Sequence, residues 1–223
     1  MAGFPPETID FLADLRADNH KDWFHANRDR YEAHYLAPAR AFVEAAGAAI
    51  RDFAPDIAFE PVVGGSMFRV NRDIRFTASN EPYKPYVDLW FWEGERRSAP
   101  SGFYLRLTPE TVAVGVGAYQ FDGAQLARYR GAVADPRAGA GLQATLDDLQ
   151  AAGFEIPQPD LKRVPEGFDA DGEHADLLRH KRLFVAGEAD HPGVLGTARF
   201  VGWCARRWEQ QAPLHRWLVT HLG

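Results

Sequence analysis

Five segments with strand-like composition follow one another in the middle of the chain, and helical patterns lie on both sides of them. The segments are residues 59–63, 66–70, 86–92, 103–107 and 111–117. The third reads Tyr-Val-Asp-Leu-Trp-Phe-Trp, a composition strongly enriched in strands. The last two flank Thr108-Pro-Glu110, which is typical of a hairpin. Consecutive strands with short connections favour an antiparallel or mixed sheet.

Helical patterns occupy residues 5–53 and most of the chain after residue 122. Ile9, Leu12 and Leu15 recur at helical spacing, and Pro38 is suited to open a later helix. Asp122 is a suitable N-cap for a helix that runs to about Ala134. We expect further helices at 136–153, 174–179 and 196–222, the last interrupted near Pro213, and one more strand at 183–185. The order predicts an α+β fold: a single domain (1–223) with an antiparallel or mixed central sheet on which the N-terminal and C-terminal helices pack.

A cation-rich segment lies between the second and third strand candidates. Residues 67–86 interleave four cations with large apolar residues, and we expect a loop at 71–85. Cations enter a partly buried segment only when something pairs with them. The partner is either internal, such as Asp73, Asp88 or a helix carboxylate, or it is a bound phosphate or carboxylate, for which arginine forks are suited. A solvated surface is the third interpretation. The cations are Arg69, Arg72, Arg75 and Lys84.

Neighbouring residues complete a hypothetical anion pocket. Lys84 stands between Pro82-Tyr83 and Pro85-Tyr86, and the two prolines stiffen its loop. The segment equally fits a surface turn. Tyrosines would form polar-tipped walls, and Asp73 would orient an arginine or act as a base. The candidate ligand-binding residues are Arg69, Arg72, Asp73, Arg75, Tyr83, Lys84, Tyr104 and Tyr119.

The charge balance argues against nucleic acid as a partner. The segment 67–86 carries a net +2, which leaves −8 for the rest of a chain whose net charge is −6. Nucleic-acid binders usually present an extended basic face, whereas a small cationic patch on an acidic body attracts small anions.

Other classes of site and location are not indicated. Cys204 is the single cysteine, so neither an intramolecular disulfide nor a cysteine zinc site is expected. The spacing of His174 and His180 is unspecific for a metal, and no Ser-His-Asp arrangement is visible. We predict no metal, no cofactor, no targeting segment and no membrane span, and therefore a cytoplasmic location.

Several short motifs together resemble a known family. They are Trp23-Phe24 with Asn27 and Tyr31, the run Phe68–Phe76, Pro82-Tyr83-Lys84, Gly102-Phe-Tyr104, Gly117-Ala-Tyr119, and 161–168 with 178–181. The chain resembles an uncharacterised bacterial and fungal family, domain of unknown function 2461. Asn80 and Glu81 depart from its pattern, in which a lysine and a hydroxyl residue are common. The resemblance implies one compact cytoplasmic domain and supplies no activity, catalytic residue or cofactor.

Two functional hypotheses follow. The first is a small-molecule binding protein or enzyme whose arginine-rich pocket holds a phosphate or carboxylate group. The alternative is a non-catalytic interaction or scaffold protein in which the arginines form a structural ion-pair network. The sequence leaves open whether a reaction is catalysed, which residues would catalyse it, and the oligomeric state.

Overall fold

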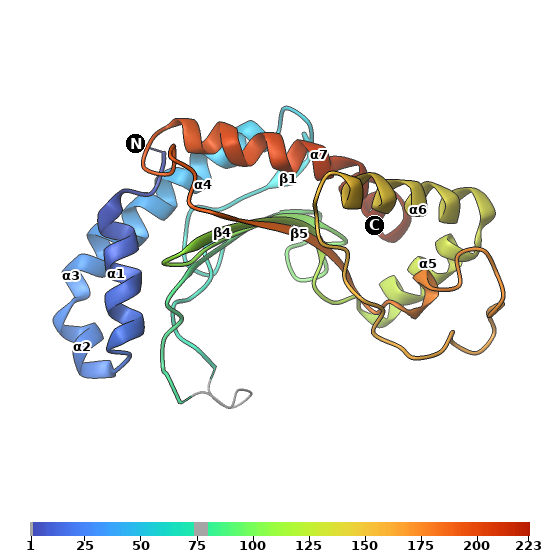
Figure 1. The fold of residues 1–223 in the computed structure, drawn as a ribbon, viewed down its shortest axis with the longest axis horizontal. Helices are drawn as coiled ribbons and strands as arrows, with labels where there is room; N and C mark the ends of the chain where they lie inside the picture. The colour runs from blue at the N-terminus through green and yellow to red at the C-terminus, as the bar shows by residue number, and fades with distance from the viewer. Residues whose placement is uncertain (1, 74–79) are drawn as a thin grey trace. The chain divides into compact units, whose positions relative to one another are not determined.

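The structure, a computed structural model, describes residues 2–73 and 80–223. Arg75, one of the expected ligand-binding residues, lies outside the described residues. The elements, labelled in part in Figure 1, are α1 (Pro6–Ala17), α2 (Lys21–Ala26), α3 (Arg28–Arg30), η1 (Tyr31–Leu36), α4 (Ala37–Ile50), β1 (Ile57–Ala58), β2 (Val87–Glu93), β3 (Gly102–Leu107), β4 (Thr111–Ala118), α5 (Gly123–Ala134), α6 (Pro136–Ala151), η3 (Leu177–Arg179), β5 (Leu183–Asp190) and α7 (Arg199–Leu222).

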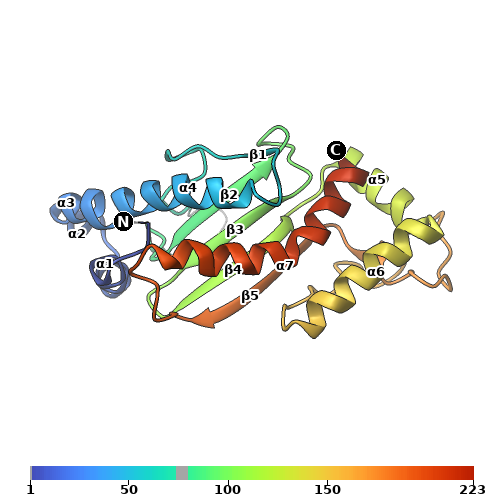
Figure 2. The same cartoon turned by 90° about the horizontal axis from the view of Figure 1, so that it is seen from above.

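The strands form one antiparallel sheet in the order β1-β2-β3-β4-β5, so the predicted α+β class is confirmed. Thr108 donates its backbone N–H to the carbonyl of Thr111, which closes the predicted β3–β4 hairpin. Residues at alternate positions, such as Leu89, Leu105 and Val112, are fully buried. Figure 2 shows α4 and α7 lying over the sheet. The period-2 pattern of the strands therefore gives the sheet one buried face.

The predicted strand at 59–63 is wrong. The chain turns there: Ser66 N–H donates to the Glu60 carbonyl at 2.8 Å, and Glu60 N–H donates to Ser66 Oγ at 3.0 Å. Gly64 adopts a φ of 91°, which glycine tolerates without a steric penalty. Val62 is 51% exposed in this turn, so its apolar side chain does not pack in the core.

Other boundaries also differ from prediction. Segment 66–70 is not a strand and pairs with β2 at one isolated bridge among the described residues, that of Met67 with Leu89. The strand predicted at 183–185 extends to Asp190. The expected interruption at Pro213 is absent, because α7 continues through it and the proline lies on the exposed side.

The chain divides into two compact units. The first comprises Met1–Phe91, Tyr104–Val114 and Glu188–Arg207, and the second Trp92–Phe103, Gly115–Gly187 and Trp208–Gly223. That residues 1–223 make a single domain stays a prediction. Among the described residues, no helix combines the length and hydropathy that crossing a bilayer requires.

Each unit has its own aromatic packing. In the first, the rings of Phe42 and Phe200 lie 5.4 Å apart. In the second, the Tyr129 hydroxyl donates to the Leu177 carbonyl at 3.0 Å. Asp122 caps α5 as predicted, by accepting from the backbone N–H of Gln125.

Candidate functional site

The cation-rich segment forms an antiparallel excursion whose base is closed by backbone hydrogen bonds. Arg72 N–H donates to the Pro82 carbonyl and Lys84 N–H donates to the Val70 carbonyl, both at 2.8 Å. Asn71 and Tyr83 form an antiparallel bridge. Residues 70–72 and 82–84 therefore lie side by side although a loop separates them in sequence.

Arg72 is held inside this excursion. Its Nη2 donates to Glu81 Oε2 at 3.1 Å and to the Tyr83 carbonyl at 3.4 Å. Arg72 is therefore paired with a carboxylate of the protein itself, but this carboxylate is Glu81 rather than Asp73 or Asp88. Glu81 therefore gives Arg72 an anionic partner within the chain.

Tyr83 lies in the core rather than in a pocket wall. Its ring stacks on Phe24 with centroids 4.2 Å apart. The side chain of buried Asn19 donates to the Tyr83 carbonyl at 3.1 Å and accepts from its N–H at 3.0 Å. Asn19 thus anchors the excursion to the segment between α1 and α2. Sequence reasoning assigned no such role to Asn19.

The other candidates in this segment are more accessible. Arg69 and Asp73 are exposed, and Lys84 is partly exposed. Lys84 Nζ lies 5.9 Å from the centroid of the Phe68 ring, within the range of a cation–π contact. Arg69, Arg72 and Lys84 therefore have different environments.

A tighter cluster forms where β2 and β3 are neighbours. Arg106 donates from Nε to Asp88 Oδ1 at 2.7 Å and from Nη2 to Asp88 Oδ2 at 2.9 Å. The Tyr104 hydroxyl donates to Asp88 Oδ1 at 2.5 Å. The Arg106 guanidinium lies 4.2 Å from the centroid of the Tyr86 ring. Asp88 thus accepts three hydrogen bonds, the arrangement that a buried carboxylate requires.

The environments of these groups differ. The Asp88 side chain is 8% exposed, whereas that of Arg106 is 42% exposed. Burial, followed by the charge of Asp88, raises the pKa of Tyr104, so its hydroxyl stays protonated as a donor. Burial, the largest single effect, lowers the pKa of Arg106, but the hydrogen bond to Asp88 and the charges of Asp88 and the neighbouring tyrosines together outweigh it, so the pKa is raised. Arg106 is therefore a fixed, permanent cation.

Sequence reasoning named Tyr104 but missed Arg106, the cation that binds the same carboxylate, Asp88. The available signal was one charged residue at an outward position of each of two adjacent apolar strands. Asp88 and Arg106 occupy such positions. Charged residues of opposite sign that face each other across a strand pair are expected to interact.

The cluster belongs to a partly exposed face of the sheet in the first unit. Opposite to the fully buried positions of the same strands, alternate residues retain intermediate exposure, except Asp88, which is buried. Because Asp88 faces Arg106, the antiparallel register places Trp90 opposite Tyr104. We define this surface as the arginine face, which consists of Phe68, Lys84, Tyr86, Asp88, Trp90, Tyr104, Arg106 and Ala113.

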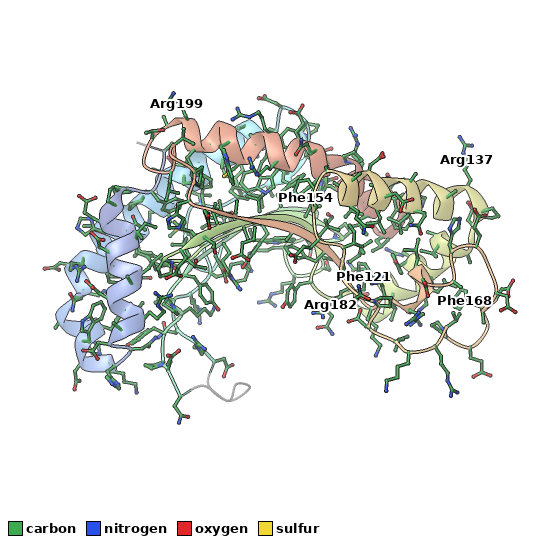
Figure 3. All side chains as sticks on the ribbon, in the orientation of Figure 1. Phe121, Arg137, Phe154, Phe168, Arg182 and Arg199 are labelled. Atoms are coloured by element: carbon green, nitrogen blue, oxygen red, sulfur yellow. The ribbon has the colours of Figure 1, made fainter. Side chains whose placement is uncertain are left out.

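Tyr119, the remaining candidate, lies in the second unit. It is 73% exposed. The guanidinium of Arg182, which Figure 3 labels, lies 5.5 Å from its ring centroid. Tyr119 is therefore not counted as part of the arginine face.

The second unit contains a buried chain of polar groups that the sequence did not reveal. His215 Nδ1 lies 3.0 Å from Ser101 Oγ, and His215 Nε2 lies 2.9 Å from Glu93 Oε2. Burial lowers the pKa of His215 although Glu93 opposes the shift. Ser101 is completely buried, so a substrate does not reach its hydroxyl. The arrangement connects the end of β2, the residue before β3, and α7.

His174 lines a cavity of about 220 Å³ in the second unit, together with Phe168, Glu173 and Leu178. Both of its ring nitrogens are buried without a hydrogen-bond partner among the described residues. Within residues 2–73 and 80–223, no three His, Cys, Asp or Glu side chains lie close enough together to hold a metal ion.

The comparisons with known proteins identify the family. The conserved hypothetical protein family (DUF2461) matches residues 7–217, nearly the whole chain. The chain belongs to this family, as its motifs indicated. A comparison with curated proteins finds no match.

Proposed function

We propose that this protein binds a small molecule with a phosphate or carboxylate group, and that the arginine face is its binding surface. The observation that carries the proposal is the state of Arg106. Two of its five N–H groups are used by Asp88, which leaves three donors without a partner among the described residues. The guanidinium is fixed by two hydrogen bonds and by Tyr86, yet it remains accessible.

Fixed donors favour binding because little side-chain entropy is lost when the ligand arrives. Arginine recognises carboxylate and phosphate through parallel N–H donors. Asp88 neutralises Arg106, so the net positive charge of the face comes from Lys84, whose ammonium lies over Phe68. The original pocket hypothesis thus keeps Lys84 and Tyr104 and replaces Arg72 with Arg106.

Calorimetric titration at low ionic strength tests the proposal, with inorganic phosphate, acetate, phenyl phosphate and benzoate as probes. We expect at least one to bind, and we expect Arg106→Lys and Lys84→Gln to weaken its binding. Arg16→Gln is the matched control, because Arg16 is an exposed arginine of the same unit paired with Glu110 at 2.6 Å. The proposal fails if no probe binds, or if the folded variants bind as tightly as the wild type.

The second candidate is an interaction or scaffold protein in which the arginines are structural. The observation that favours it is the pairing of Arg72 with Glu81. It requires that Arg72→Ala lower the stability and that no anion bind to the arginine face. Urea denaturation of Arg72→Ala, together with the titrations above, distinguishes the two candidates.

A further inference from the structure

We propose that the ligand of the arginine face is an aromatic anion, an arene phosphate or carboxylate, whose ring packs against Trp90 while its anionic group meets Arg106. This inference rests on the proposed function and deepens it. The face combines two kinds of recognition element in adjacent positions: accessible guanidinium donors and partly exposed aromatic rings.

The register brings these elements to a suitable separation. Trp90 follows Asp88 by two residues on β2, and Tyr104 precedes Arg106 by two residues on β3. Two residues of a strand span about 7 Å, so the Trp90–Tyr104 pair lies one position along the same face from Arg106. A single aromatic ring with a directly attached anionic group is short enough to engage both positions.

The aromatic residues of the face are not equivalent. Lys84 lies over Phe68, and Arg106 lies 4.2 Å from the ring centroid of Tyr86 and 5.7 Å from that of Tyr104, so these three rings already have a cation contact. Within residues 2–73 and 80–223, neither a cation nor another ring covers the indole of Trp90. Trp90 nevertheless remains partly exposed in a strand whose alternate residues are fully buried. Accessible tryptophan beside fixed donors is typical of a surface that binds a planar ligand.

The neighbouring strand places a small side chain beside Arg106. The β3–β4 hairpin register places Ala113 opposite Arg106. Alanine projects only a methyl group, so no large side chain of β4 stands directly beside the guanidinium. A bulky residue at this position would block the access of a ligand to the Arg106 donors.

Matched probe pairs test the inference by calorimetry: phenyl phosphate against inorganic phosphate, and benzoate against acetate. We expect the aromatic member of each pair to bind at least about tenfold more tightly, because stacking of its ring on an aromatic side chain adds to the binding free energy. Trp90→Ala should remove this advantage while inorganic phosphate still binds. Trp203→Ala is the control, because Trp203 is a tryptophan of the same unit that is covered by Arg207 at 3.6 Å and lies on α7.

The outcomes separate the two proposals. Equal binding within each pair, or an aromatic advantage that persists in Trp90→Ala, overturns the aromatic inference and leaves the anion site standing. Phenol binding as tightly as phenyl phosphate overturns it too. Failure of every anion to bind refutes the proposed function itself. If Trp90→Ala does not fold, the indole N–H signal of Trp90, assigned by its loss in Trp90→Phe, provides the readout: it must shift with phenyl phosphate and stay unchanged with inorganic phosphate.

Discussion

The Asp88–Arg106 pair predicts unequal effects when its two members are removed. Arg106→Gln leaves the Asp88 carboxylate, 8% exposed, with only the Tyr104 hydroxyl as a donor from this cluster. Stranding one charge of a buried pair costs about 3–5 kcal/mol, and the 42% exposure of Arg106 favours the lower end. Asp88→Asn keeps an acceptor and leaves a guanidinium that water can solvate, so we expect about 1–2 kcal/mol.

Urea denaturation followed by circular dichroism at pH 7 measures both changes in the free energy of unfolding. The double variant Asp88→Asn/Arg106→Gln contains no stranded charge, so it should be less destabilised than the sum of the single variants. Arg16→Gln, which removes an exposed ion pair, should match the wild type within error. Equal effects of the two single variants, or strict additivity in the double variant, would refute the claim that Asp88 is buried and dependent on Arg106.

Three further predictions concern other contacts. Tyr104→Phe removes a hydrogen bond to a charged acceptor and should lower the free energy of unfolding by about 1.5–3 kcal/mol in urea denaturation, whereas an unchanged midpoint would contradict the bond. Asn19→Ala strands the N–H and C=O of Tyr83 and should lower it by about 2 kcal/mol or more, with increased proteolysis of the excursion as a second readout; resistance equal to the wild type would argue against the anchor. Because burial lowers the pKa of His215, the unfolded chain binds a proton that the folded chain does not, so stability should fall as the pH drops below about 6.5, by at most about 1.4 kcal/mol per pH unit for this residue. His215→Gln should reduce that slope, and an unchanged slope would contradict the assignment.

The fold class was readable from the sequence because its signals are local. The composition of 86–92 and the alternating apolar residues of 103–107 and 111–117 specify strands, and Asp122 specifies a helix start. The error at 59–63 has a physical cause: apolar composition favours a strand, but Gly64 and the Glu60–Ser66 hydrogen bonds favour a turn. Composition alone does not rank these two preferences.

The candidate site was less predictable because it depends on contacts between strands. Arg69, Arg72 and Lys84 are close in sequence, and the backbone nevertheless gives them separate environments. Asp88 and Arg106 are 18 residues apart and become partners through the β2–β3 register. Spacing along the chain fixes neither that register nor the partner of a buried charge.

The most direct test of the central claim is the response of Arg106 itself to a bound anion. The side-chain Nε–H signal of Arg106, assigned by its loss in Arg106→Lys, can be followed by nuclear magnetic resonance during titration with phenyl phosphate. The arginine face predicts a saturable shift of this signal with the affinity measured by calorimetry, and no shift of the Arg16 signal. An Arg106 signal that stays unchanged while phenyl phosphate saturates the protein would contradict the account.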